Sequence, residues 1–130
     1  AVTVSYVPIT QIGSVKLAGS VAANGVDTVT FTVNGVAHAV SQSDSTLAIA
    51  STWNTSEFNI FGNGSNSPVA SFNRGSTVAV KLAVNDGSTR APTCIGPADG
   101  GTTAESNNLN LGRCSATGGS APAIQFTQSN

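Results

Sequence analysis

Few residues in this chain of 130 could do chemistry, and His38, the single histidine, limits the choice of mechanism. Any catalytic triad or histidine-based metal site would have to be built around it. In the predicted hairpin at Asn34-Gly35, His38 lies opposite Phe31 on the apolar side, which favours a half-buried histidine at the end of a sheet. No sequence neighbour offers a nucleophile in a recognisable elbow. This pattern does not indicate an enzyme.

The six carboxylates are spread along the chain instead of forming a cluster. Four of them lie in or beside turns, where an aspartate commonly caps local backbone groups: Asp27, Asp44, Asp86 and Asp99. Glu57 and Glu105 form a conceivable glycosidase pair, but a domain this small has little room for the necessary cleft. Calcium near Asn85-Asp86 or Asp99 is an alternative, although no loop has dense acidic spacing. We predict no metal site, no cofactor and no catalysis.

Trp53 is the aromatic residue best placed for ligand binding. It ends a predicted strand and is followed by Asn54-Thr55-Ser56. Sugar rings present apolar C–H faces and hydroxyl groups, which match an aromatic platform surrounded by amides. We therefore predict that Trp53, Asn54 and Asn59 bind a glycan. The alternative is that Trp53 is the central core tryptophan of a sandwich, because it shares an alternation with Leu47, Ile49 and Ser51.

Cys94 and Cys114 are the only cysteines, and without a nearby histidine they are too few to hold zinc. We predict a disulfide that closes a loop of about 20 residues and contributes roughly 3 kcal/mol to stability. One of its two ends, Cys94, lies in the irregular stretch 90–101. A disulfide together with scarce lysine and glutamate predicts an extracellular or cell-surface location.

The composition excludes several classes of partner. Charged residues make up 8% of the chain and the net charge is −1, whereas an ordinary soluble domain is about 25% charged. Five scattered cations cannot neutralise a run of phosphates, so we expect no nucleic-acid binding. No run approaches the ~20 apolar residues that span a bilayer, so we expect no membrane insertion.

The balance of 14 Val against 5 Leu favours strands, and period-2 alternation recurs along the chain. Asn34-Gly35 is a preferred type I′ turn pair, which predicts a hairpin over Val26–Val40. The fold class is all-β: a single domain over 1–130, an antiparallel β-sandwich of immunoglobulin-like or jelly-roll-like kind, with one disulfide and eight or nine short strands. The expected strands cover 1–7, 15–21, 26–33, 36–40, 46–53, 57–61, 78–84, 107–111 and 123–128.

Two functions from different classes fit this chain. The first is a secreted, non-catalytic, lectin-like module that binds a glycan or polysaccharide. The alternative is a self-assembling subunit of an extracellular fibre, pilus or shell. It is suggested by the absence of charged side chains before Lys16 and after Arg113, which leaves both terminal strands without the charges that normally guard a sheet edge. The composition is similar to that of lectins, fibre subunits and immunoglobulin-like surface domains, an analogy that assigns no residue roles.

Overall fold

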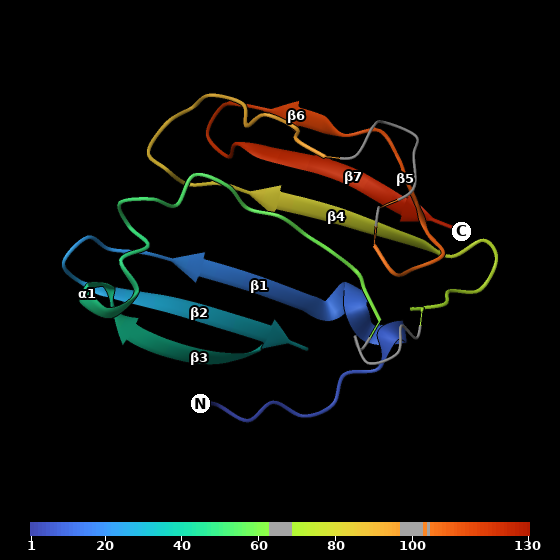
Figure 1. Ribbon diagram of the computed structural model, residues 1–130, viewed down its shortest axis with the longest axis horizontal. Coiled ribbons are helices and arrows are strands. Elements are labelled where there is room, and N and C mark those ends of the chain that lie inside the picture. Colours follow the sequence, from blue (N-terminus) through green and yellow to red (C-terminus); the bar gives the residue numbers. More distant parts are fainter. Residues whose placement is uncertain (63–68, 97–102, 104) are drawn as a thin grey trace. The chain divides into compact units, whose positions relative to one another are not determined.

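The computed structural model describes residues 1–62, 69–96, 103 and 105–130. Backbone contacts divide the chain into two compact units, Ala1–Thr55 and Ser56–Asn130. Each unit contains one antiparallel sheet (Figure 1), so the predicted β-rich, antiparallel character is confirmed. No helix in the described ranges has the length and apolar character needed to cross a membrane.

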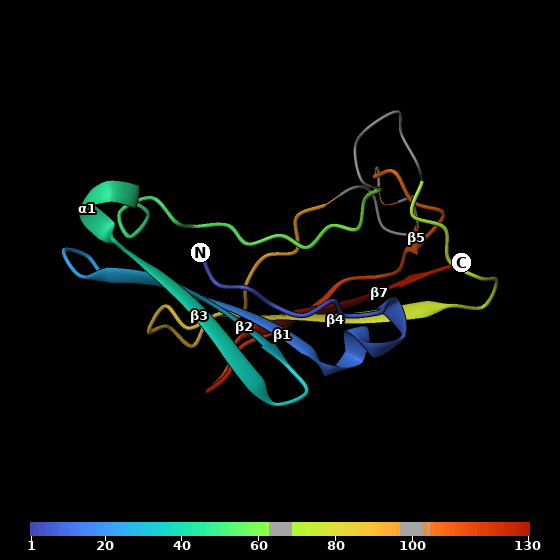
Figure 2. The same cartoon turned by 90° about the horizontal axis from the view of Figure 1, so that it is seen from below.

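The sheet of the first unit is a three-stranded meander. It contains β1 (Val15–Ser20), β2 (Val26–Val33) and β3 (Val36–Ser43) in the order β1-β2-β3. The predicted hairpin is confirmed, and its turn residues Asn34 and Gly35 have φ of 49° and 79°, the positive values that a type I′ turn requires. Figure 2 shows the short helix α1 (Asp44–Leu47) at the end of β3.

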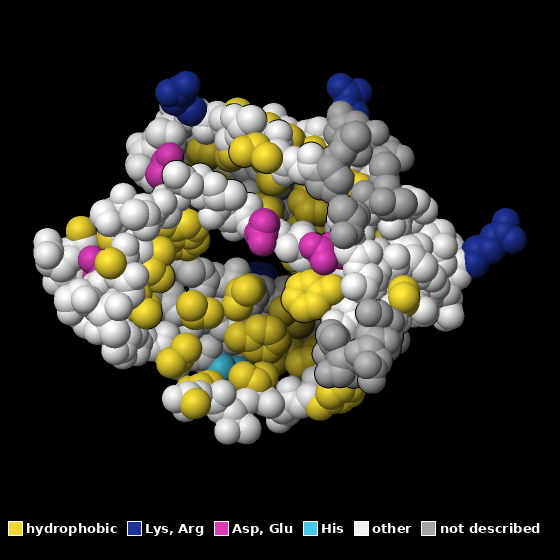
Figure 3. Space-filling model, viewed as in Figure 1, with side chains coloured by type: hydrophobic (Ala, Val, Ile, Leu, Met, Phe, Trp, Pro, Cys, Tyr) yellow, Lys and Arg dark blue, Asp and Glu magenta, His cyan; other side chains and the backbone are white. Residues whose placement is uncertain are grey.

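The register gives this sheet one apolar and one polar face. Paired residues share a face, so the predicted pairing of Phe31 with His38 is confirmed. Figure 3 shows the histidine, in cyan, among hydrophobic side chains. The apolar face carries Val15, Leu17, Gly19, Val29, Phe31, Val33, Val36, His38 and Val40, and the polar pair Asp27 and Gln42 lies at its end. The polar face carries Lys16, Ala18, Ser20, Thr28, Thr30, Thr32, Ala37, Ala39 and Ser41.

The sheet of the second unit is built around its last strand. β7 (Ala123–Ser129) pairs with β4 (Thr77–Ala83) on one side, and with β5 (Asn110–Leu111) and β6 (Ser115–Thr117) on the other. The C-terminal strand is therefore internal to its sheet. Val80, Leu109 and Ala123 are buried here, and the rings of Phe58 and Phe126 meet edge to face at 6.4 Å.

Three expected strands are wrong. Residues 1–7 and 57–61 form no strand, and 46–53 is replaced by α1 and a turn. The N-terminal segment leads instead into a 3₁₀ helix, Ile9–Ser14. The described residues contain seven strands, fewer than the eight or nine expected, and the strand predicted over 107–111 is shortened to β5. β6 was not predicted, because three residues are too few to show an alternation.

Candidate functional site

Trp53 is fixed in position by its own turn. The backbone N–H groups of Thr52 and Trp53 both donate to the carbonyl oxygen of Ile49, at 3.0 and 2.8 Å. At the other end of the side chain, the indole Nε1–H donates to the carbonyl oxygen of Thr55 at 2.8 Å. These contacts hold both the backbone and the polar end of the indole, so the orientation of the ring is defined before any ligand binds.

The indole ring lies against Gly19 at a corner of the first sheet. A Cβ atom built on Gly19 would stand 2.8 Å from Cη2 of Trp53, so the ring fills the space that a side chain would need. Gly19 is the penultimate residue of β1, which is an edge strand, and it belongs to the apolar face. Trp53 itself remains 45% exposed. The indole therefore covers the end of the apolar face, and the face does not enclose the indole.

Asp44 organises the turn that carries Trp53. Its Oδ1 accepts a hydrogen bond from the backbone N–H of Ala50 at 3.1 Å, and its Oδ2 accepts one from Asn24 at 3.3 Å. Ser43 caps α1 through its hydroxyl, and Ala48 ends the helix with a left-handed φ of 54°. These bonds from side chains to the backbone compete with strand pairing, which explains why the expected strand over 46–53 does not form.

The capping role predicted for the aspartates is confirmed at every one that the structure describes. Besides Asp44, the buried Asp27 accepts a hydrogen bond from the backbone N–H of Ala22 at 3.2 Å. Asp86 accepts one from Ser88 at 2.9 Å, and this backbone bond holds the pKa of the Asp86 carboxyl below its ordinary value. Asp99 lies outside the described residues. No cluster of three or more His, Cys, Asp or Glu side chains occurs in the described part of the chain.

The predicted partners of Trp53 fall in different places. Asn54 is exposed beside it, and its Oδ1 accepts a hydrogen bond from the Thr55 hydroxyl at 2.9 Å. Asn59 belongs to the second unit, where its amide donates to Oε1 of Glu57 at 3.3 Å. The structure therefore brings Trp53 and Asn54 together, and the participation of Asn59 stays a prediction.

Two asparagines have structural roles that the sequence did not reveal. Oδ1 of Asn107 accepts hydrogen bonds from the Thr103 hydroxyl and the Leu109 N–H, both at 2.9 Å, and its Nδ2 donates to the Ile60 carbonyl. Asn108 bonds to both the N–H and the carbonyl of Phe72, at 2.8 and 2.9 Å. These amides hold irregular backbone in place. The one available signal was that these are the only two adjacent asparagines of the chain, and adjacency alone does not indicate which backbone groups they bond.

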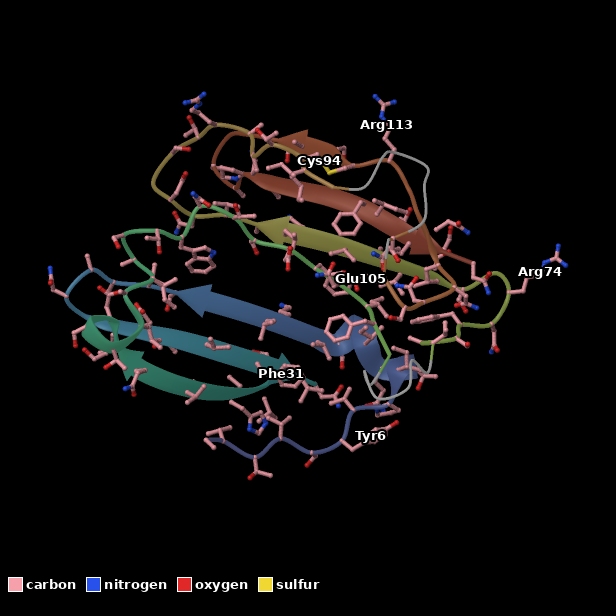
Figure 4. All side chains as sticks on the ribbon, in the orientation of Figure 1. Tyr6, Phe31, Arg74, Cys94, Glu105 and Arg113 are labelled. Atoms are coloured by element: carbon pink, nitrogen blue, oxygen red, sulfur yellow. A yellow bond between two sulfur atoms is a disulfide. The ribbon has the colours of Figure 1, made fainter. Side chains whose placement is uncertain are left out.

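The predicted disulfide is confirmed. Cys94 and Cys114 are bridged, with their Cα atoms 6.2 Å apart. It joins the irregular segment after β4 to the residue just before β6 (Figure 4, which labels Cys94).

Comparison of the chain with family models, with the sequences of characterised proteins and with solved structures finds no match. Function is therefore inferred from the described residues themselves.

Proposed function

We propose that this chain is a secreted, non-catalytic carbohydrate-binding module in which a sugar ring stacks on Trp53. The observation that carries the proposal is the half-exposed indole, held against Gly19 and by the bond from Nε1 to the Thr55 carbonyl. A side chain that is already ordered loses little conformational entropy when a ligand binds, which favours affinity.

The surroundings of Trp53 favour a neutral sugar. Asn54, Thr55 and Ser56 follow it directly, and Ser51 and Thr52 precede it, so the sequence neighbours on both sides of Trp53 carry amide and hydroxyl groups. Such groups can hydrogen-bond to sugar hydroxyls while the aromatic ring takes the apolar C–H face. Asn59 lies in the second unit, so its predicted participation is not part of this proposal.

We also propose that residues 1–130 form one sandwich domain, of immunoglobulin-like or jelly-roll-like kind. In support, each sheet has one apolar face, and an apolar sheet face needs a covering layer. On the second sheet this face carries Val78, Val80, Leu82, Ile124 and Phe126, with the buried Gln128 beside Val78. Secretion is supported by the disulfide, since such bonds persist in oxidising compartments.

The experiment is retention on insoluble neutral polysaccharides, compared between the unaltered chain and Trp53→Ala. The proposal predicts that retention is lost while the melting temperature changes by a few degrees. Tyr6→Ala is the matched control, because Tyr6 is another exposed aromatic residue in the same unit, and its loss should leave retention unchanged. A core tryptophan would instead cost about 3–5 kcal/mol on truncation. A loss of that size, or retention without the indole, would contradict the proposal.

Self-assembly remains the second candidate, although not through the terminal strands, because residues 1–7 form no strand and β7 is internal to its sheet; the edge strand β3 favours it instead. This strand is eight residues long, carries neither Lys, Glu nor Pro, and has no partner strand beyond β2 among the described residues. Uncharged, unguarded edges are templates for pairing with another chain. A monomeric mass in sedimentation at high concentration would exclude this candidate, and a dimer disrupted by Val40→Lys would support it.

A further inference from the structure

A shallow hollow of about 250 Å³ lies on the polar face of the second sheet. Ala79 of β4, Ser115 of β6, and Gln125 and Thr127 of β7 line it from this face, together with Arg113, and Val80 and Phe126 at the intervening strand positions complete the lining. The register explains the hollow, because Ala79 pairs with Thr127 and Ser115 pairs with Gln125, so three short side chains leave space beside the longer Gln125. Figure 4 shows the Arg113 side chain projecting outward at the surface.

A second cation lies on the face of the sheet that holds the hollow. Lys81 shares this face, because Lys81 pairs with Gln125 and so points to the same side. The other outward positions of β4, β6 and β7 are Thr, Ala, Ser and Gln, with no carboxylate among them. Among the described residues of β4, β6, β7 and the lining of the hollow, the charged side chains are therefore Lys81 and Arg113, a pair that complements an anionic ligand.

Arg113 lies between two fixed points of the backbone. The N–H of Gly112 donates to the carbonyl oxygen of Thr127 at 2.8 Å, and a Cβ on Gly112 would stand 2.6 Å from Oγ1 of Thr127. This close approach requires a glycine. On the other side of Arg113, Cys114 is bridged to Cys94. The rim of the hollow is therefore anchored on both sides of the guanidinium-bearing residue.

We propose that this hollow binds the carboxylate of a uronic acid residue in an acidic polysaccharide. A guanidinium group matches a carboxylate through two parallel hydrogen bonds. Gln125 and the hydroxyls of Ser115 and Thr127 provide partners for ring hydroxyls, and Ala79 provides a small apolar floor. The hollow is smaller than the ~300–1,000 Å³ pockets of drug-sized ligands, so it suits one sugar residue. The inference rests on the proposed function for the class of ligand, but it does not involve Trp53.

The test compares two polymers that differ in charge but share a backbone: polygalacturonate and its methyl ester. Binding of each is measured by calorimetry on the full chain and on Arg113→Gln, which removes the positive charge and the guanidinium fork. Arg74→Gln is the matched control, since it removes an exposed cation of the same unit and alters the net charge equally. Arg113→Lys and Gln125→Ala separate charge from geometry, and thermal melts confirm that every variant is folded.

We expect polygalacturonate to bind and the ester to bind at least tenfold more weakly. Arg113→Gln should weaken binding of polygalacturonate at least tenfold, Arg113→Lys and Gln125→Ala severalfold, and Arg74→Gln less than twofold. Equal effects of Arg113→Gln and Arg74→Gln, or equal binding of dextran sulfate, would show non-specific attraction of polyanions and overturn the inference. Trp53→Ala separates the two proposals, because it should abolish retention on neutral polysaccharide and leave polygalacturonate binding intact.

Discussion

Trp53 and Gly19 are complementary: the indole ring of one lies where any side chain on the other would stand, with Cη2 only 2.8 Å from that Cβ position. The glycine therefore provides the seat for the aromatic ring. The indole Nε1 bond to Thr55 then fixes how the ring lies on that seat. The proposed sugar platform depends on both contacts.

Gly19→Ala tests this seat. The added methyl group should displace the ring, and because the 45% exposed indole can move outward into solvent, the loss of stability should be about 1 kcal/mol, the low end for overpacking. Tryptophan emission should shift to the red, and retention on polysaccharide should fall. Gly13→Ala is the control, because a Cβ there has no atom within 4 Å. Unchanged emission and retention in Gly19→Ala would show that Gly19 does not position the ring.

Asn107→Ala tests the amide that holds the second unit together. The substitution removes hydrogen bonds to Thr103, Leu109 and Ile60. Because this leaves backbone groups in part-buried positions without partners, we expect the free energy of unfolding to fall by about 2–4 kcal/mol. Chemical denaturation of Asn107→Ala and of Asn110→Ala, an exposed asparagine of β5, provides the comparison. Equal, small losses in both variants would contradict the structural role of Asn107.

Reduction of the Cys94–Cys114 bridge should loosen the segments around it before either sheet unfolds. The physical reason is that residues 92–96 lie in no strand and that β5 and β6 are only two and three residues long. Hydrogen exchange with and without reductant should show lost protection near Cys114 and unchanged protection in β2 and β3. Equal protection near Cys114 in both conditions would mean that the bridge does not order this region.

Reduction should also weaken polygalacturonate binding, because Arg113 is next to Cys114.

Asp86 should make stability depend on pH in the acid range. The Ser88 backbone bond lowers the pKa of the folded-state carboxyl from its ordinary 3.8, so the ionised form is favoured by folding. Its contribution is fully present above that ordinary value and is lost as the pH falls through the lower folded value. The stability difference between the unaltered chain and Asp86→Asn should therefore exist at neutral pH and vanish in acid. A difference independent of pH would contradict this account.

The elements that the sequence predicted correctly are those determined by short-range pattern. β2 and β3 have alternating apolar residues on either side of Asn34-Gly35, and apolar residues also alternate in β4 and β7. These four strands could therefore be predicted without knowing which strands they pair with. The segment 46–53 also alternates. Its conformation is nevertheless set by the Asp44 carboxylate, which bonds to Ala50 and to Asn24 in a distant loop. A period-2 pattern of apolar residues carries no information about such hydrogen bonds.

The candidate site was predictable only in part for the same reason. The sequence indicated Trp53 and Asn54 as neighbours and left open whether the indole lay in a core or at a rim. The contact with Gly19 depends on the turn through Ile49, and nothing in the spacing of Gly19 and Trp53 points to it. The hollow beside Arg113 could not be predicted from the sequence either, because β6 forms part of its lining and is too short to show an alternation.

The most direct test of sugar stacking on Trp53 is a titration of the unaltered chain with soluble neutral oligosaccharides, followed by tryptophan emission. Trp53 is the only tryptophan, so the signal reports this residue alone. If a sugar ring stacks on Trp53, tryptophan emission should show a saturable blue shift and acrylamide should quench it less, because the stacked ring excludes water and quencher from the indole. Oligosaccharide binding that calorimetry detects while emission and quenching stay unchanged would place the ligand elsewhere and contradict the account.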